Sequence, residues 1–131
     1  MSAENVEAVR AALDAWNRDD WDAIIANATS DFELDMSRAE GPFRGVYGVG
    51  QVRRFWESFA ANWESRRFEA HEFVDAGEHV VVPVTLHTRG REGIEVSARI
   101  THLWTFRDGR IAGMRMYQRR AEALAAAGLS D

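Results

Sequence analysis

The sequence of 131 residues contains no cysteine, so it has no disulfide framework, which agrees with a cytoplasmic location. Its longest apolar runs, such as Val80-Val81-Val82, are only a few residues long. We therefore expect neither a transmembrane span nor a secretory signal, and no membrane partner. The net charge is −5 and the arginine pairs have acidic residues close by, which argues against nucleic-acid binding.

Several chemical signatures are also missing. The four histidines show no close ligand spacing such as His-x-His, so we expect no transition-metal site. No Gly-x-Ser-x-Gly motif is present, which argues against that kind of serine hydrolase. The glycines between residues 38 and 50 match neither nucleotide-binding fingerprint. The sequence therefore predicts no metal and no cofactor.

The residues that are present predict one domain, residues 1–131, with a sizeable core. Hydrophobic residues make up 46% of the chain and include five Trp and seven Phe. Apolar periodicity predicts helices over 3–17, a short stretch after Asp20, 49–63 and 121–127. Alternation predicts strands over 31–37, 66–75, 79–88, 94–106 and 111–118. This order indicates an α+β fold with helices on one face of a curved antiparallel sheet.

The stretch 94–118 has two runs of β-forming residues around Asp108-Gly109, which predicts a β-hairpin. A two-residue loop would bury Arg115 beside Trp104, which is costly without a partner. A three-residue loop, with Gly109 in the left-handed region, shifts the pairing by one residue and turns Arg115 away. We therefore predict the three-residue loop.

This register collects the large apolar residues of both strands on one face. The face comprises Ile100, His102, Trp104, Phe106, Ala112, Met114 and Met116. Its titratable group is His102, which is either a satisfied core histidine or a neutral hydrogen-bonding group in a pocket, because burial disfavours the cation. In the strand over 31–37, Phe32 and Leu34 share one face, and the alternation alone turns Asp35 towards water.

The element order, the glycine-rich loop, the aromatic helix 49–63 and the final Phe-Arg-Asp-Gly-Arg-Ile turn resemble the SnoaL-like branch of the NTF2-like superfamily. The resemblance covers essentially the whole chain. It implies a cone, in which a bent, mostly antiparallel sheet wraps three N-terminal helices around an apolar pocket. The superfamily includes ketosteroid isomerase, polyketide cyclases and many non-enzymatic proteins, so the fold alone does not give the function.

By position, the resemblance implies that Asp35 matches the general-base aspartate of ketosteroid isomerase and that His102 matches its protonated, oxyanion-donating aspartate. The tyrosine donor of that isomerase corresponds to Ala12, so this donor is missing. Asp35 as base and His102 as acid would suit enolisation, aldol closure or dehydration. Tyr47 would add a hydroxyl, unless it is simply a half-buried aromatic of the loop.

We predict a site for an apolar ligand between the aromatic helix and the hairpin face, although an aromatic stripe is also typical of plain core. The predicted ligand-binding residues are Trp16, Tyr47, Phe55, Trp56, Phe59, His71, Trp104, Met114 and Met116.

Three functions fit these observations. The first is a small cofactor-free isomerase, cyclase or dehydratase that acts on an apolar carbonyl compound. The second is a non-catalytic module that binds a hydrophobic small molecule, and the third is a protein-interaction domain. The outer sheet face is either the surface of a homodimer, which we predict, or is covered by the C-terminal segment. This face comprises Thr101, Leu103, Thr105, Ile111 and Tyr117.

Overall fold

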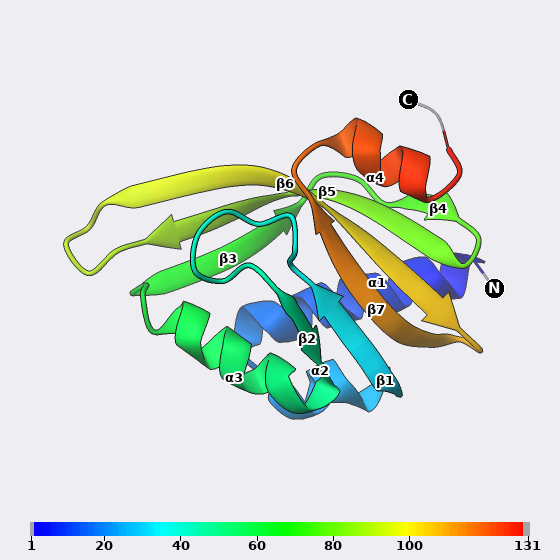
Figure 1. Ribbon diagram of the computed structural model, residues 1–131, viewed down its shortest axis with the longest axis horizontal. Coiled ribbons are helices and arrows are strands. Elements are labelled where there is room, and N and C mark those ends of the chain that lie inside the picture. The colour runs from blue at the N-terminus through cyan, green and yellow to red at the C-terminus, as the bar shows by residue number, and fades with distance from the viewer. Residues whose placement is uncertain (1, 130–131) are drawn as a thin grey trace.

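The computed structural model describes residues 2–129, which form one curved seven-stranded sheet with helices on both sides (Figure 1). The strand order is β2-β1-β7-β6-β5-β3, and β4 pairs with β5. The pairs are antiparallel except β1 with β7. The strands are β1 (Ala28–Asp35), β2 (Val46–Gly48), β3 (Ser65–Ala70), β4 (Val74–Ala76), β5 (His79–Arg89), β6 (Glu95–Arg107) and β7 (Arg110–Tyr117).

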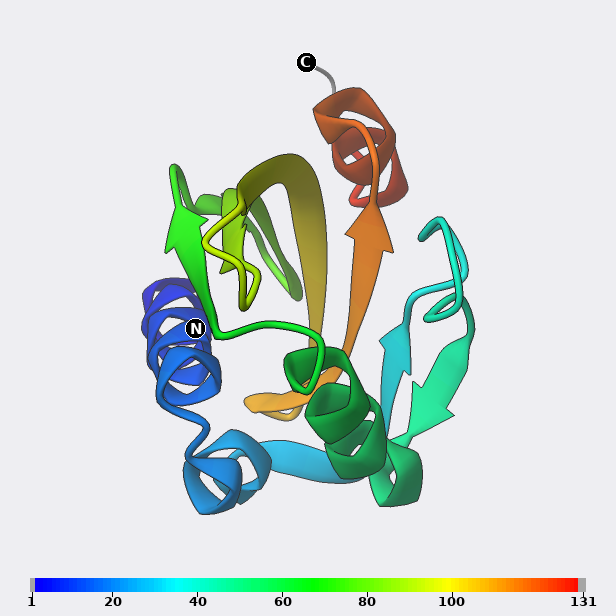
Figure 2. The same cartoon turned by 90° about the vertical axis from the view of Figure 1, so that its left-hand side faces the viewer.

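Three helices from the N-terminal half lie on the inner, concave side of the sheet (Figure 2). They are α1 (Ser2–Arg18), α2 (Trp21–Ala26) and α3 (Val49–Ala60). The main core fills the space between these helices and the inner face. The predicted α+β fold, a curved and mostly antiparallel sheet on three N-terminal helices, is therefore confirmed.

The turn between α1 and α2 is set by two aspartates. Asp19 has a φ of 56°, a left-handed conformation that Asp tolerates better than most residues and that ends α1. Asp20 then caps α2, since its carboxylate accepts a hydrogen bond of 3.2 Å from the backbone N–H of Ala23. Asp19 thus ends one helix and Asp20 begins the next.

The hairpin between β6 and β7 differs from the prediction at its turn. Arg107 pairs with Arg110, so the loop has two residues, and Asp108 and Gly109 both have positive φ angles (53° and 77°), as a type I′ turn requires. The predicted three-residue loop is therefore wrong. A β-bulge then places the extra residue, Ala112, between the pairs Phe106–Ile111 and Thr105–Gly113.

Beyond the bulge the register is the predicted one. His102 pairs with Met116 and Trp104 pairs with Met114. Before the bulge, Ile111 rather than Ala112 lies opposite Phe106 on the inner face. The bulge therefore brings apolar residues from both registers to the core side of the sheet.

Part of the outer face of the sheet, over β5, β6 and β7, is covered by α4 (Arg120–Ala126), as Figure 1 shows. Ala123 and Leu124 of this helix form a second buried cluster with Val81, Leu103 and Tyr117. Of the face predicted to form a homodimer, Leu103 is 0% exposed, Tyr117 6% and Thr101 3%, and Ile111 belongs to the inner core. The surface expected for a partner is therefore largely buried within the chain itself.

The strand predicted over 66–75 is interrupted, and the interruption accommodates Pro83 of β5. Proline has no backbone N–H to give to a neighbouring strand. The carbonyl of Pro83 accepts a hydrogen bond of 2.9 Å from the N–H of His71, so its nitrogen faces the gap between β3 and β4. The short strand β2 was not predicted, because it lies in the glycine-rich stretch. Among residues 2–129, no helix has the length and apolar character to cross a membrane.

Candidate functional site

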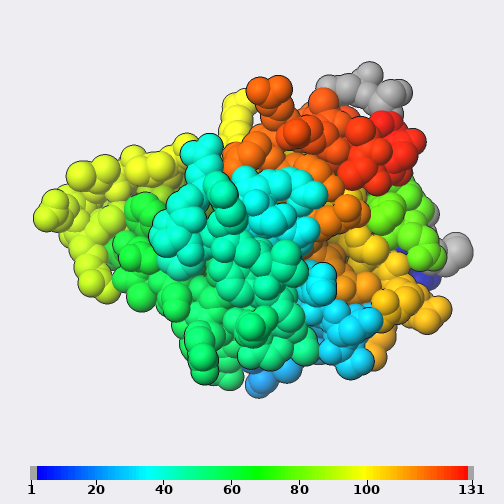
Figure 3. All heavy atoms as spheres, viewed as in Figure 1, coloured from blue at the N-terminus to red at the C-terminus, as the bar shows by residue number. Residues whose placement is uncertain are grey.

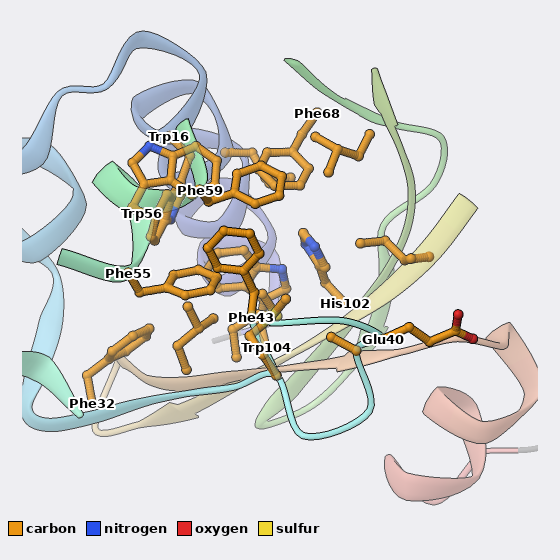
Figure 4. Close-up of a pocket in the computed structure, with 17 residues that line it drawn as sticks. Trp16, Phe32, Glu40, Phe43, Phe55, Trp56, Phe59, Phe68, His102 and Trp104 are labelled. Carbon is orange, nitrogen blue, oxygen red and sulfur yellow. The ribbon is translucent and has the colours of Figure 1, made fainter. Parts of the chain in front are cut away.

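A largely apolar cavity lies between the inner face of the sheet and the helices α1 and α3 (Figure 4). Its volume is about 140 Å³. Its lining consists of Leu13, Trp16, Phe32, Leu34, Met36, Ala39, Glu40, Phe43, Phe55, Trp56, Phe59, Phe68, Leu86, Ile100, His102, Trp104 and Met114. An apolar cavity of about 150 Å³ can stay dry and hold a benzene molecule. The cavity therefore matches one aromatic ring in size.

The helix α3 supplies one wall because its aromatic residues recur at helical spacing. The ring of Trp56 lies edge-on to Trp16 of α1 and stacks against Phe59 and Phe68, with ring centres 4.7, 5.6 and 5.8 Å apart. The indole N–H of Trp56 donates a hydrogen bond of 2.8 Å to the carboxylate of Asp19. This bond fixes the ring and leaves its apolar surface to the cavity.

His102 brings a titratable group to the opposite wall. Its side chain is 2% exposed and lies edge-on to Phe68 of β3 and to Trp104, with ring centres 5.3 and 5.8 Å apart. Burial in these apolar surroundings lowers the pKa of His102 from 6.5 to about 3. The imidazole is therefore neutral at physiological pH and acts as a hydrogen-bonding group rather than as a cation.

Two buried nitrogen atoms at this wall lack partners among the described residues. They are Nδ1 of His102 and Nε1 of Trp104. Both side chains project from the core face of β6, two residues apart, and Figure 4 shows the imidazole directed into the cavity. Leaving a buried polar atom unpaired costs roughly 1–3 kcal/mol. The wall of the cavity therefore contains two hydrogen-bonding groups that no described residue satisfies.

Most predicted site residues line this cavity. These are His102, Trp16, Phe55, Trp56, Phe59, Trp104 and Met114. The others, Asp35, Tyr47, His71 and Met116, lie outside its lining.

Asp35 is the important exception, because the structure does not bring it together with His102. Its carboxylate accepts a hydrogen bond of 2.9 Å from the N–H of Ser37 and contacts Arg38 at 3.5 Å. Partial burial acts to raise the pKa of Asp35, but these hydrogen bonds and the charge of Arg38 leave it below its usual value. Asp35 lies on the side of β1 opposite Leu34. The alternation of the strand predicts this direction, whereas the resemblance to ketosteroid isomerase implies the other one.

The remaining exceptions have other partners. The hydroxyl of Tyr47 donates a hydrogen bond of 2.9 Å to the backbone carbonyl of Phe43, outside the cavity. His71 contacts Thr85 through Nε2 at 2.6 Å, on the outer side of the sheet. Met116 is buried opposite His102 in the register but does not reach the lining.

The sequence analysis missed Phe43 and Glu40, which reach the cavity from the loop between β1 and β2. A loop has no periodicity, so no pattern could assign them an inward direction. Phe32 and Leu34 were detectable, because their alternation already placed them together on one face of β1. Among residues 2–129, no group of three or more His, Cys, Asp or Glu side chains is arranged to hold a metal ion.

Most of the chain matches one known domain family. The family model described as a SnoaL-like domain matches residues 9–114. No curated protein matches the chain. Solved structures do match, at sequence identities that show the fold alone.

Three of these structures differ in the kind of protein that they represent. TerC, co-crystallized with polyporic acid, has a TM-score of 0.78 and 21% identity, over 95% of this chain and 98% of TerC. A putative SnoaL-like polyketide cyclase from Jannaschia has a TM-score of 0.75 and 20% identity, over 88% and 85% of the two chains. A hypothetical protein with a ketosteroid isomerase-like fold from Catenulispora acidiphila, in complex with trimethylamine, has a TM-score of 0.73 and 18% identity, over 94% and 93%.

Proposed function

The chain belongs to the SnoaL-like domains of the NTF2-like superfamily. We propose that its cavity binds a small, neutral, mostly apolar molecule. The observation that carries this proposal is the pair of unpartnered nitrogens, on His102 and Trp104, that are buried in the wall of a largely apolar cavity. Apolar walls with a few convergent polar groups are typical of small-molecule sites. The solved neighbours that hold polyporic acid and trimethylamine support a small-molecule role for this fold.

The same two residues define the chemistry of the ligand. The indole of Trp104 can only donate a hydrogen bond, whereas a neutral imidazole can donate or accept one. A carbonyl or hydroxyl oxygen would satisfy such a pair. A carboxylate would find no compensating cation, since the lowered pKa keeps His102 neutral. We therefore favour a one-ring phenol or ketone over an organic acid.

The experiment measures phenol and benzene binding by calorimetry for the wild type, His102→Leu and His102→Asn. A single hydrogen bond contributes about 0.5–1.5 kcal/mol, so His102→Leu should lower the phenol-to-benzene affinity ratio roughly two- to tenfold. His102→Asn keeps a polar group near Nδ1 and should lose less. If neither ring compound binds saturably to the wild type, or if the ratio does not change in His102→Leu, the proposal is wrong.

Catalysis is the second candidate, favoured by the family and by the similarity to a putative polyketide cyclase. In this version the domain is a cofactor-free isomerase, cyclase or dehydratase, and the N–H of neutral His102 polarises a ligand carbonyl. Asp35 would have to leave its bonds to Ser37 and Arg38 in order to act as the base. Activity on a carbonyl compound that is retained in both Asp35→Asn and His102→Leu would rule out this assignment.

A homodimer also remains a proposal. Because α4 covers Leu103 and Tyr117, a partner would have to use other parts of the surface or displace that helix. Sedimentation analysis of the wild type would decide whether a dimer forms.

A further inference from the structure

The segment between β1 and β2 forms a closed loop over the cavity. Its two ends are joined, since the N–H of Met36 donates to the carbonyl of Gly45 at 2.7 Å and the N–H of Gly45 donates to the carbonyl of Met36 at 3.3 Å. Compact loops of this kind, with adjacent ends, are frequently functional. In Figure 3 the cyan atoms of this segment lie on the surface, beside the green atoms of α3.

Phe43 of this loop contributes its ring to the aromatic wall of the cavity. The ring lies edge-on to Phe55 and Phe59 of α3, with ring centres 5.9 and 5.4 Å apart. Figure 4 shows it among the lining side chains, between Phe55 and His102 in that view. Phe43 is only half-buried, so one side of it faces inwards and the other faces outwards.

The outward side of Phe43 faces a separate groove on the surface. This groove has a volume of about 400 Å³ and is lined by Pro42, Tyr47, Gly50, Gln51, Arg54 and Ser58 together with Phe43 and Phe55. Phe43 and Phe55 are thus the residues that the groove shares with the inner cavity. Phe55 belongs to the helix α3, whereas Phe43 belongs to the loop. The ring of Phe43 is therefore the part of the partition between cavity and groove that a movement of the loop would remove.

The hydrogen bonds of the loop hold this partition in place. The hydroxyl of Tyr47 binds the backbone carbonyl of Phe43 itself. Asp35 holds the start of the loop through the N–H of Ser37, and Arg44 donates from Nε to the carbonyl of Ala39 at 2.9 Å. Tyr47, which the sequence analysis assigned to the ligand, therefore holds the residue that separates the cavity from the outer groove, and Asp35 holds the start of the same loop.

We propose that Phe43 determines the size of the ligand, admitting one ring and excluding two fused rings. With Phe43 in place the inner space matches a single ring in volume. Without that ring the cavity would open into the outer groove, and a second fused ring would have apolar surface to occupy. This inference rests on the proposed binding function and adds to it a residue that sets specificity.

The test compares phenol with 2-naphthol, both neutral at pH 7, in calorimetric titrations of the wild type, Phe43→Ala and Phe73→Ala. Phe73 is a partly buried phenylalanine that packs on the core but does not line the cavity, so Phe73→Ala controls for lost packing. The wild type should bind 2-naphthol more weakly than phenol, although the larger molecule is the more apolar. Phe43→Ala should raise the 2-naphthol affinity about tenfold or more, because the second ring then becomes buried. Phe73→Ala should keep the wild-type ratio.

Circular dichroism checks that each variant is folded, and Phe43→Val replaces Phe43→Ala if the latter is not. Tight 2-naphthol binding by the wild type, or an unchanged ratio in the Phe43 variant, would overturn the inference while leaving phenol binding intact. Failure of the wild type to bind phenol would instead overturn the proposed function, so the two failures are distinguishable.

Discussion

His102 makes the stability of the folded chain depend on pH, and the substitution His102→Leu should remove this dependence. Its pKa is about 3 in the folded state because of burial, and about 6.5 in an unfolded chain. Below pH 6.5 the unfolded state therefore binds a proton that the folded state does not. The stability contributed by the neutral imidazole is complete above pH 6.5 and is lost as the pH falls towards 3. The slope in this window is about 1.4 kcal/mol per pH unit.

Urea unfolding at pH 7.5 and pH 5.0 measures this effect in the wild type and in His102→Leu. Between these pH values the wild type should lose roughly 2 kcal/mol more than the variant. The pKa of His79 is also lowered by burial, but His79 is present in both proteins and its contribution cancels in the difference. Most carboxylates titrate below this range. Equal losses in the two proteins would show that His102 is not held neutral by burial, and the argument for a neutral ligand would fail with it.

Two further substitutions test the packing that shapes the cavity, both by urea unfolding at pH 7.5. A Cβ on Gly113 of β7 would lie 2.9 Å from the backbone oxygen of Glu33 in β1, so Gly113→Ala should lower the free energy of unfolding by roughly 1–3 kcal/mol. Gly50→Ala in α3, where a Cβ would meet nothing within 4 Å, should be neutral or stabilising. An unchanged stability in Gly113→Ala would contradict the close approach of the two strands. The side-chain amide of Asn17 donates to the carbonyl of Phe68 at 3.0 Å and accepts from its N–H at 2.8 Å, so Asn17→Ala should cost roughly 1–3 kcal/mol. The control, Asn62→Ala at an exposed position just beyond α3, should cost less than about 0.5 kcal/mol. Equal effects at the two asparagines would mean that the link from α1 to β3 adds no stability.

The sequence predicted the regular elements because their patterns are repeated many times. The aromatic stripe of α3 and the alternation of β5 each provide several independent residues that agree on one face. The interruption between β3 and β4 was not predictable in this way. It depends on a single proline in a different strand, and only the paired strands show which gap that proline faces.

The hairpin shows why a correct register was reached from a wrong turn. A three-residue loop and a two-residue loop followed by a bulge both shift the pairing by one residue, so the apolar pattern beyond the turn cannot separate them. The positive φ angles of Asp108 and Gly109 decide between them, and these are properties of the backbone that the side-chain pattern does not report.

The candidate site was predicted where it lies on helices and strands and not where it lies on the loop. His102 and Trp104 followed from the alternation of β6, and the structure places both in the lining. Asp35 is a case in which pattern and resemblance disagreed, and the alternation predicted its direction correctly, because a local bond to Ser37 holds the carboxylate outside. Phe43 reaches the cavity through a loop whose path depends on glycine conformations and long-range contacts.

The bulge at Ala112 also has a consequence for how the length of the chain can vary. Ala112 has no partner across the hairpin, while the residues on either side of it are paired. Removing this one amino acid would leave all the neighbouring pairs as they are and merely straighten the strand. Removing Met114, two residues further along, would instead exchange the two sides of the strand beyond it and turn Met116, the partner of His102, outwards. The tolerance of this strand to the loss of one residue is therefore concentrated at Ala112, where a deletion would keep the side chains that line the cavity on the same face.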